Sequence, residues 1–290
     1  MSLAGGDLTT LTAVQGYIDS APSSAILSGL ITRVSRMMQS AMNRPLLVPR
    51  AYTEQFNGTG TRQIVLPNWP LLAAPALVID GCTITVAPQP SDSVAGSAWP
   101  SWGFRYQPWN GMPPGDPAVL ELTGGAFYRW GQQNVVITYN AGYQVAGEAP
   151  NAASYMPIAP WGSWATDRGV TYAGTGAALT AIASGSPAVG QYVPPAPDAP
   201  SSPTTAYTFN ATDIATGLLI SYGFIPADVE QAAIEFISER ASYRKRVGVR
   251  SQSLAGQEVM SYDLSAINRF VQMTLQPDIS VIPPSMGASG

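Results

Sequence analysis

Histidine is absent from the 290 residues, and cysteine occurs once, at Cys82. Without histidine the chain lacks the commonest general base, the usual zinc ligand and every Ser–His or Cys–His arrangement. A single cysteine excludes intrachain disulfides and cysteine-rich metal sites. We expect Cys82 to be a small buried side chain in a strand, as free cysteines commonly are.

Charge is also scarce. Only 11% of the residues are charged, the formal net charge is −4 and the sequence pI is about 4.8. Soluble domains are usually about one quarter charged. The acidic balance argues against a general nucleic-acid binder. A surface so poor in charge is often covered by other chains, because charged residues are depleted at the centre of interfaces.

Long hydrophobic runs are missing, and no stretch approaches the ~18 apolar residues of a membrane span. The first residues, MSLAGGDLTT, have neither a basic region nor an apolar run, so they predict no signal peptide. We therefore expect no membrane partner.

Enzyme motifs are missing as well: there is no phosphate loop, no GxSxG and no dinucleotide fingerprint. The stretch GTGTR, residues 58–62, has no helix after it and predicts a hairpin turn rather than a phosphate cradle. The carboxylate pairs Asp116 with Glu121 and Asp167 with Asp213 have the composition of a glycosidase site, but the sequence does not place them at catalytic distance. The chain is thus predicted to be no enzyme and to need no cofactor.

Hydrophobic periodicity predicts an α+β fold. Apolar residues at three- and four-residue spacing predict helices over 9–19, 23–43, 226–248 and 263–277, with Ser23 or Ser24 capping the second. Between residues 51 and 143 the period is two, and turn signals such as Asp80-Gly81 and Gly124-Gly125 separate the strands. We expect a loop from 249 to 262.

Four parts follow from this pattern. A small helical bundle is made by residues 1–50 and 224–276, and a β-sheet portion spans 51–143. An inserted β-rich minidomain covers 144–223, and residues 277–290 form a C-terminal tail. Within the β portion lies a Trp/Pro-rich loop, 89–117, whose Trp99, Trp102 and Trp109 are predicted to pack on their own sheet or on a neighbouring subunit. Sugar stacking is the alternative.

Positive charge is concentrated at the end of the helix at 226–248. Five of the 14 Lys and Arg residues fall within positions 240–250: Arg240, Arg244, Lys245, Arg246 and Arg250. The helix dipole favours cations there. However, none of the five has an acidic residue three or four positions away, which excludes an intrahelical ion-pair ladder. These cations are solvated, neutralised elsewhere in the fold, or paired with another chain.

The order of the parts resembles the head–tail connector proteins of tailed bacteriophages, also called adaptor or head-completion proteins. The resemblance rests on a capped helix ending in NRP, then TEQFNGTGTRQIVLPNWPLLAAPALVIDG, VITYNAGY and IPADVEQAAIEFISERASYRKRVGVRSQSLAGQEVMSYD. It covers residues 7–88, 118–143 and 225–276. The segment 144–223 departs from the minimal pattern, and its GVTY…GQY…YTFNATD wording is similar to small β-modules of other phage structural proteins.

The resemblance implies a structural virion protein at the neck of the particle, made in the host cytoplasm. Its implied partners are the portal protein, neighbouring copies in a twelve-fold ring, and a stopper or tail terminator protein. DNA would pass through the channel without sequence-specific binding. The basic cluster is then expected to meet acidic groups on the portal or on a neighbouring copy, with DNA phosphate as the competing partner. The alternative function is a tail- or capsid-associated module that binds host carbohydrate.

Overall fold

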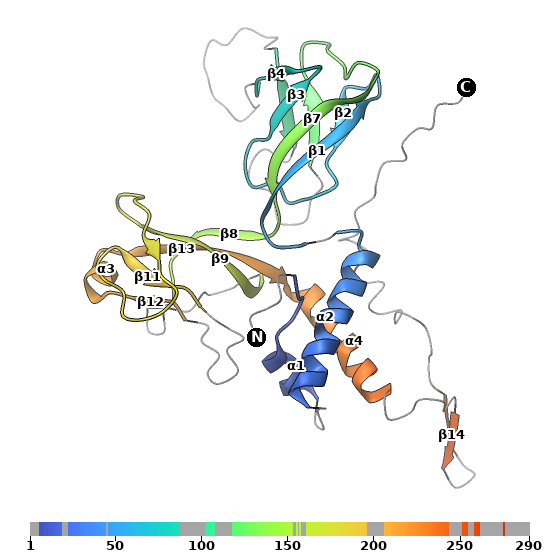
Figure 1. Ribbon diagram of the computed structural model, residues 1–290, viewed down its shortest axis with the longest axis vertical. Coiled ribbons are helices and arrows are strands. Elements are labelled where there is room, and N and C mark those ends of the chain that lie inside the picture. Colours follow the sequence, from blue (N-terminus) through green and yellow to red (C-terminus); the bar gives the residue numbers. More distant parts are fainter. Residues whose placement is uncertain are drawn as a thin grey trace. The chain divides into compact units, whose positions relative to one another are not determined.

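The structure is a computed structural model that describes residues 6–18, 23–44, 46–87, 102–107, 118–152, 155, 157, 161–195, 206–243, 251–254, 258–261 and 275. The predicted α+β fold is confirmed, with helices and several antiparallel sheets (Figure 1). The chain divides into two compact units. Unit 1 comprises Met1–Pro45 and Val145–Ile279, and unit 2 comprises Leu46–Gln144 and Ser280–Gly290.

Three helices of unit 1 pack together: α1 (Leu11–Tyr17), α2 (Ser24–Ala41) and α4 (Ala227–Tyr243). Thr10 caps α1 by accepting a hydrogen bond from the Ala13 amide at 3.2 Å. Ser23 occupies the N-cap position of α2, as predicted, but makes no side-chain cap bond there. In the predicted stripe of α2 most residues are buried, but Leu30 is partly buried and Ala41 is exposed. The helix α4 buries a broad face that includes two adjacent alanines. The buried apolar residues of the two helices are Leu27, Ile31, Val34, Met38, Val229, Ala232, Ala233, Ile234, Phe236, Ile237 and Ala241.

A three-stranded sheet of unit 1 continues directly into α4. Its order is β8 (Gln144–Glu148), β13 (Leu218–Pro226) and β9 (Gly162–Tyr172). The strand β13 ends at Pro226, and α4 begins at the next residue (Figure 1). Glu230 of α4 accepts hydrogen bonds from Ser163 of β9 and, at 3.3 Å, from Thr9 before α1. One partly buried carboxyl group therefore joins the sheet, α4 and the N-terminal segment.

A second small sheet lies in the same unit. Its order is β10 (Thr180–Ala181), β11 (Gln191–Val193) and β12 (Thr208–Phe209), and the short helix α3 (Ala211–Ala215) follows it. Residues 145–223 cluster with the helices in one compact unit. The predicted minidomain boundary at 223–224 falls inside β13, because that strand pairs with β9 along its whole length, from Leu218 to Pro226.

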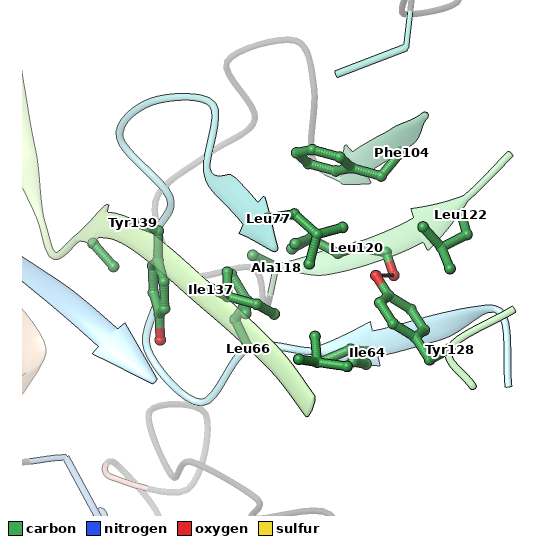
Figure 2. Packing of buried hydrophobic residues seen from close by; sticks show 12 residues of the cluster. Ile64, Leu66, Leu77, Phe104, Ala118, Leu120, Leu122, Tyr128, Ile137 and Tyr139 are labelled. Atoms are coloured by element: carbon green, nitrogen blue, oxygen red, sulfur yellow. Dashed lines mark hydrogen bonds between the residues drawn. The ribbon is translucent and has the colours of Figure 1, made fainter. Parts of the chain in front are cut away.

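Unit 2 is built from two antiparallel sheets with a shared core. The first has the order β1 (Arg50–Gly58), β7 (Gly131–Ala141), β3 (Ala76–Ile79) and β4 (Cys82–Ile84). The second has the order β2 (Gln63–Val65), β6 (Val119–Leu122) and β5 (Phe104–Gln107). Figure 2 shows Leu77 and Ile137 of the first sheet packed together with Ile64, Leu120 and Phe104 of the second. Alternation along each strand directs one face of each sheet into this core.

The sequence predicted a local turn correctly but a strand pairing wrongly. Asp80 and Gly81 have φ of 49° and 80° and close the β3–β4 hairpin, as a primed two-residue turn requires. The hairpin predicted at residues 58–62 is wrong: β1 pairs with β7 and β2 pairs with β6, so this segment links two sheets. The chain turns at Gly60, where φ is 72°.

Two further expectations differ from the structure. Cys82 is in a strand, as predicted, but it is exposed rather than buried, because it follows the turn at the start of the edge strand β4. The loop predicted at 249–262 contains two paired strands, β14 (Ser251–Leu254) and β15 (Glu258–Ser261). The helix predicted at 263–277 lies outside the described residues except for Leu275, which is helical and buried.

Candidate interaction surfaces

The basic cluster is described at one residue only. Arg240 lies in the last turn of α4 and is partly buried, with its guanidinium carbon 4.9 Å from the centroid of the Phe236 ring. This i,i+4 cation–π contact holds the cation at the helix end that the dipole also favours. The other four predicted residues, Arg244, Lys245, Arg246 and Arg250, lie outside the described part of the chain. Their placement stays a prediction.

Of the three predicted tryptophans, Trp102 is described and is 72% exposed. Its ring lies against Gly124, where a Cβ atom would stand 3.3 Å from the indole. It therefore contacts a turn of its own unit, while most of the ring remains open, and its packing on the sheet or on a neighbouring subunit stays a prediction. Trp99 and Trp109 lie outside the described residues.

Two exposed aromatic residues beside Trp102 were missed in the sequence. Trp130 is 75% exposed and Phe127 is 54% exposed. The only signal was the run FYRW at 127–130, in which Tyr128 alone is buried. Trp102, Phe127 and Trp130 are referred to below as the aromatic rim.

Backbone hydrogen bonds join the segments that carry the rim. The Gly60 amide donates to the Tyr128 carbonyl at 2.7 Å, and the Tyr128 amide donates to the Thr61 carbonyl at 2.8 Å. The Thr123 amide donates to the Gly103 carbonyl at 2.9 Å. The connection after β1, the segment before β5 and the turn after β6 therefore lie together at the same part of unit 2.

The carboxylate pair Asp167 and Asp213 is part of a tyrosine network. The Tyr192 hydroxyl donates to Oδ2 of Asp167 at 2.6 Å, and the Tyr207 hydroxyl donates to Oδ1 at 3.0 Å. The Tyr172 hydroxyl donates to Oδ1 of Asp213 at 2.6 Å. The Gly190 amide donates to Oδ2 of Asp213 at 2.9 Å. Every carboxylate oxygen of the pair accepts a hydrogen bond from the chain itself.

The ionisation of these tyrosines follows from their partners. The hydrogen bond to Asp213 raises the pKa of Tyr172. Burial raises the pKa of Tyr192 and of Tyr207, and the neighbouring Asp167 raises both further. The hydroxyls thus stay protonated donors at neutral pH. The bonds connect β9 of one sheet with β11 of the small sheet and with α3, which indicates a stabilising network. Of the other carboxylate pair, Asp116 lies outside the described residues and Glu121 stands opposite Arg105 and Gln63 in the β2–β6–β5 sheet.

One hollow of about 240 Å³ lies in unit 1, lined by Ala149, Pro150, Tyr155, Ile214 and Leu218 among others. Its lining carries no charged side chain, so it offers no acid or base for chemistry. Across the described ranges, no group of three or more acidic or cysteine side chains is arranged to hold a metal ion. Within those same ranges, none of the helices combines the length and hydropathy needed to cross a membrane.

No family model matches the chain, and no curated protein matches it significantly.

Proposed function

We propose that the protein is a head–tail connector of a tailed bacteriophage. In this role copies form a ring beneath the portal protein, continue the DNA channel and present a docking surface to a stopper or tail terminator protein. The proposed location is the neck of the virion, and no cofactor is needed. The order of motifs along the chain is the observation that carries this proposal.

The structure supports the proposal through the elements that these motifs form. The NRP motif, residues 43–45, follows the end of α2, and its Arg44 is only 1% exposed. The segment IPADVEQAAIEFISER forms the end of β13 and most of α4. These two motifs contribute to one helical bundle, and the intervening TEQF and VITYNAGY motifs form β1 and β7, which pair in unit 2.

The charge of the chain also suits a channel protein. A wall that passes DNA without gripping it must not neutralise many phosphates, since each neutralised phosphate adds to affinity. A net charge of −4 meets this condition. The cations concentrated from Arg240 onward are then available for acidic groups on the portal, since arginine pairs well with carboxylates at interfaces.

A portal attachment experiment tests the proposal. The full chain is mixed with the portal protein of the same virus and examined by negative-stain electron microscopy, and a ring added to one end of the portal is the expected result. The double variant Arg244→Glu, Arg246→Glu should abolish attachment, and attachment of the wild type should weaken as salt is raised. The matched control is Arg33→Glu, Arg168→Glu, which reverses two exposed cations elsewhere in unit 1 and should attach normally. Bare portals in the wild-type mixture would refute the proposed function.

Carbohydrate binding is the second candidate, and the exposed ring of Trp102 favours it. Flat, open indole rings are suitable for stacking on sugars. A glycan array probed with the full chain separates the two functions, because a connector should give no signal. Binding that is lost in Trp102→Ala and retained in Trp161→Ala, which removes an exposed indole of unit 1, would favour the carbohydrate module.

A further inference from the structure

The aromatic rim is held in place rather than loosely exposed. Trp130 lies against Gly60, where a Cβ atom would stand 2.7 Å from Nε1 of the indole, and Trp102 lies against Gly124. Each indole packs against the backbone of a glycine, and this contact restricts the motion of an otherwise solvent-exposed ring. Exposed tryptophans fixed in this way resemble the anchor residues of protein interfaces.

Two cations accompany the rim. Arg62 lies in the connection from β1 to β2, and Arg129 lies between Tyr128 and Trp130. Both are exposed. The Arg62 carbonyl accepts from the Leu122 amide at 2.9 Å, and the Arg129 carbonyl accepts from the Asn134 side chain at 3.1 Å, so both backbones are fixed. Arginine and tryptophan are the residues most enriched at the energetic centre of interfaces.

A surface of opposite charge lies on α4. Asp228 and Gln231 are exposed and Glu235 is partly exposed, and their spacing of three and four residues puts them on one face of the helix. No Lys or Arg stands three or four positions from Asp228 or Glu235. The Gln231 side chain donates to Glu235 at 2.9 Å, which orients that carboxylate without neutralising it. These three residues are referred to below as the acidic face.

We infer that the aromatic rim, with Arg62 and Arg129, docks on the acidic face of a neighbouring copy of the chain. This inference rests on the proposed function, because a ring needs two different complementary patches on each copy. A contact between unlike patches is heterologous and repeats around a closed ring, whereas a single self-complementary patch closes a dimer. The rim carries two exposed cations and the face carries two carboxylates, so the charges of the two patches are opposite in sign and equal in number.

Charge reversal distinguishes this contact from others. The rim variant is Arg62→Glu, Arg129→Glu, and the face variant is Asp228→Arg, Glu235→Arg. Each variant alone has two patches of the same sign, so self-association should be weakened at least about tenfold. In an equimolar mixture the reversed rim of one variant meets the reversed face of the other, and the native rim meets the native face, so copies of the two variants alternate. The mixture should therefore regain association close to that of the wild type.

Sedimentation velocity of the full chain, from about 10 to about 500 µM, measures this association without a portal, since a weak lateral contact grows with concentration. Circular dichroism melts first establish that both variants are folded. The expected result is concentration-dependent association for the wild type and the mixture, and monomers for each variant alone. The inference is overturned if the wild type stays monomeric, if either variant associates normally alone, or if the mixture does not recover.

Portal attachment separates this inference from the proposed function. If the wild type forms rings on the portal, and the rim variant and the face variant each form them alone, the protein is a connector but its lateral contact lies elsewhere. If duplex DNA, tested at low salt, is retained by the wild type and released by the rim variant, the rim binds nucleic acid and the inference is wrong. If the wild type and the mixture associate in solution but no rings form on portals, the lateral contact stands and the connector function fails.

Discussion

Asp213 is the residue whose replacement should most clearly affect the β-rich part of unit 1. Its side chain is 1% exposed and accepts hydrogen bonds from the Tyr172 hydroxyl and the Gly190 amide. The carboxylate thus joins α3 to β9 and to the turn before β11. Hydrogen bonds to a charged group contribute about 1.5–3 kcal/mol each, so the loss of two in Asp213→Ala should lower the free energy of unfolding of unit 1 by roughly 3–6 kcal/mol.

The amide variant Asp213→Asn tests the contribution of the charge. The asparagine oxygen can still accept from the Gly190 amide, and its NH₂ group can donate to the oxygen of Tyr172, so both partners remain paired. The loss should be about 1–3 kcal/mol, because hydrogen bonds to a neutral group contribute about 0.5–1.5 kcal/mol each instead of about 1.5–3 kcal/mol. Glu235→Ala is the matched control, because among the described residues its carboxylate bonds only Gln231, on the helix surface, and its removal should change stability by less than about 0.5 kcal/mol.

Calorimetry with hydrogen exchange provides the measurement. The Asp213→Ala transition of unit 1 should fall by roughly 6–24 °C, on the scale of 2–4 °C per kcal/mol. Amide exchange should rise in β9 and β11 and stay unchanged in β7 of unit 2. A shift below about 2 °C for Asp213→Ala, or equal exchange in both units, would refute the view that this carboxylate stabilises the network.

Three other substitutions have defined outcomes. Burial raises the pKa of the Glu230 carboxyl, so the cost of ionising it is absent below the pKa of the unfolded chain and complete above the folded pKa. Glu230→Gln should therefore gain stability relative to the wild type as pH rises from about 4 to about 8, measured by urea unfolding, and a constant difference would contradict this. Gly60→Ala should destabilise unit 2 by about 1–3 kcal/mol, because φ is 72° and the new methyl group would displace Trp130; an unchanged melting temperature would show that the indole is not seated there. Arg244→Glu with Arg246→Glu should leave the isolated chain folded, with a loss of about 0.3–1 kcal/mol per charge from the helix dipole, and thermal melts would detect a larger structural role.

The elements of this fold follow from short-range patterns. The stripe from Leu27 to Met38 predicts α2 because five apolar residues at helical spacing need one buried face. Asp80-Gly81 predicts its hairpin because few other pairs adopt positive φ at both positions. The class of the fold, and the absence of histidine-dependent chemistry, are likewise determined by the residues alone. These properties depend on neighbours a few positions apart, and the sequence contains those neighbours directly.

Pairing and exposure were decided by contacts between distant residues. The strands on either side of Gly60 look like a hairpin, yet β1 pairs with β7 and β2 with β6. Alternation marks Cys82 as a strand residue but does not show that β4 is an edge strand. Likewise, Asp167 and Asp213 have the composition of a catalytic pair, and only the folded chain shows five donors, among them the Gly169 amide, directed at their oxygens. Burial and hydrogen-bond partners depend on segments tens of residues away, so only the tertiary structure determines them.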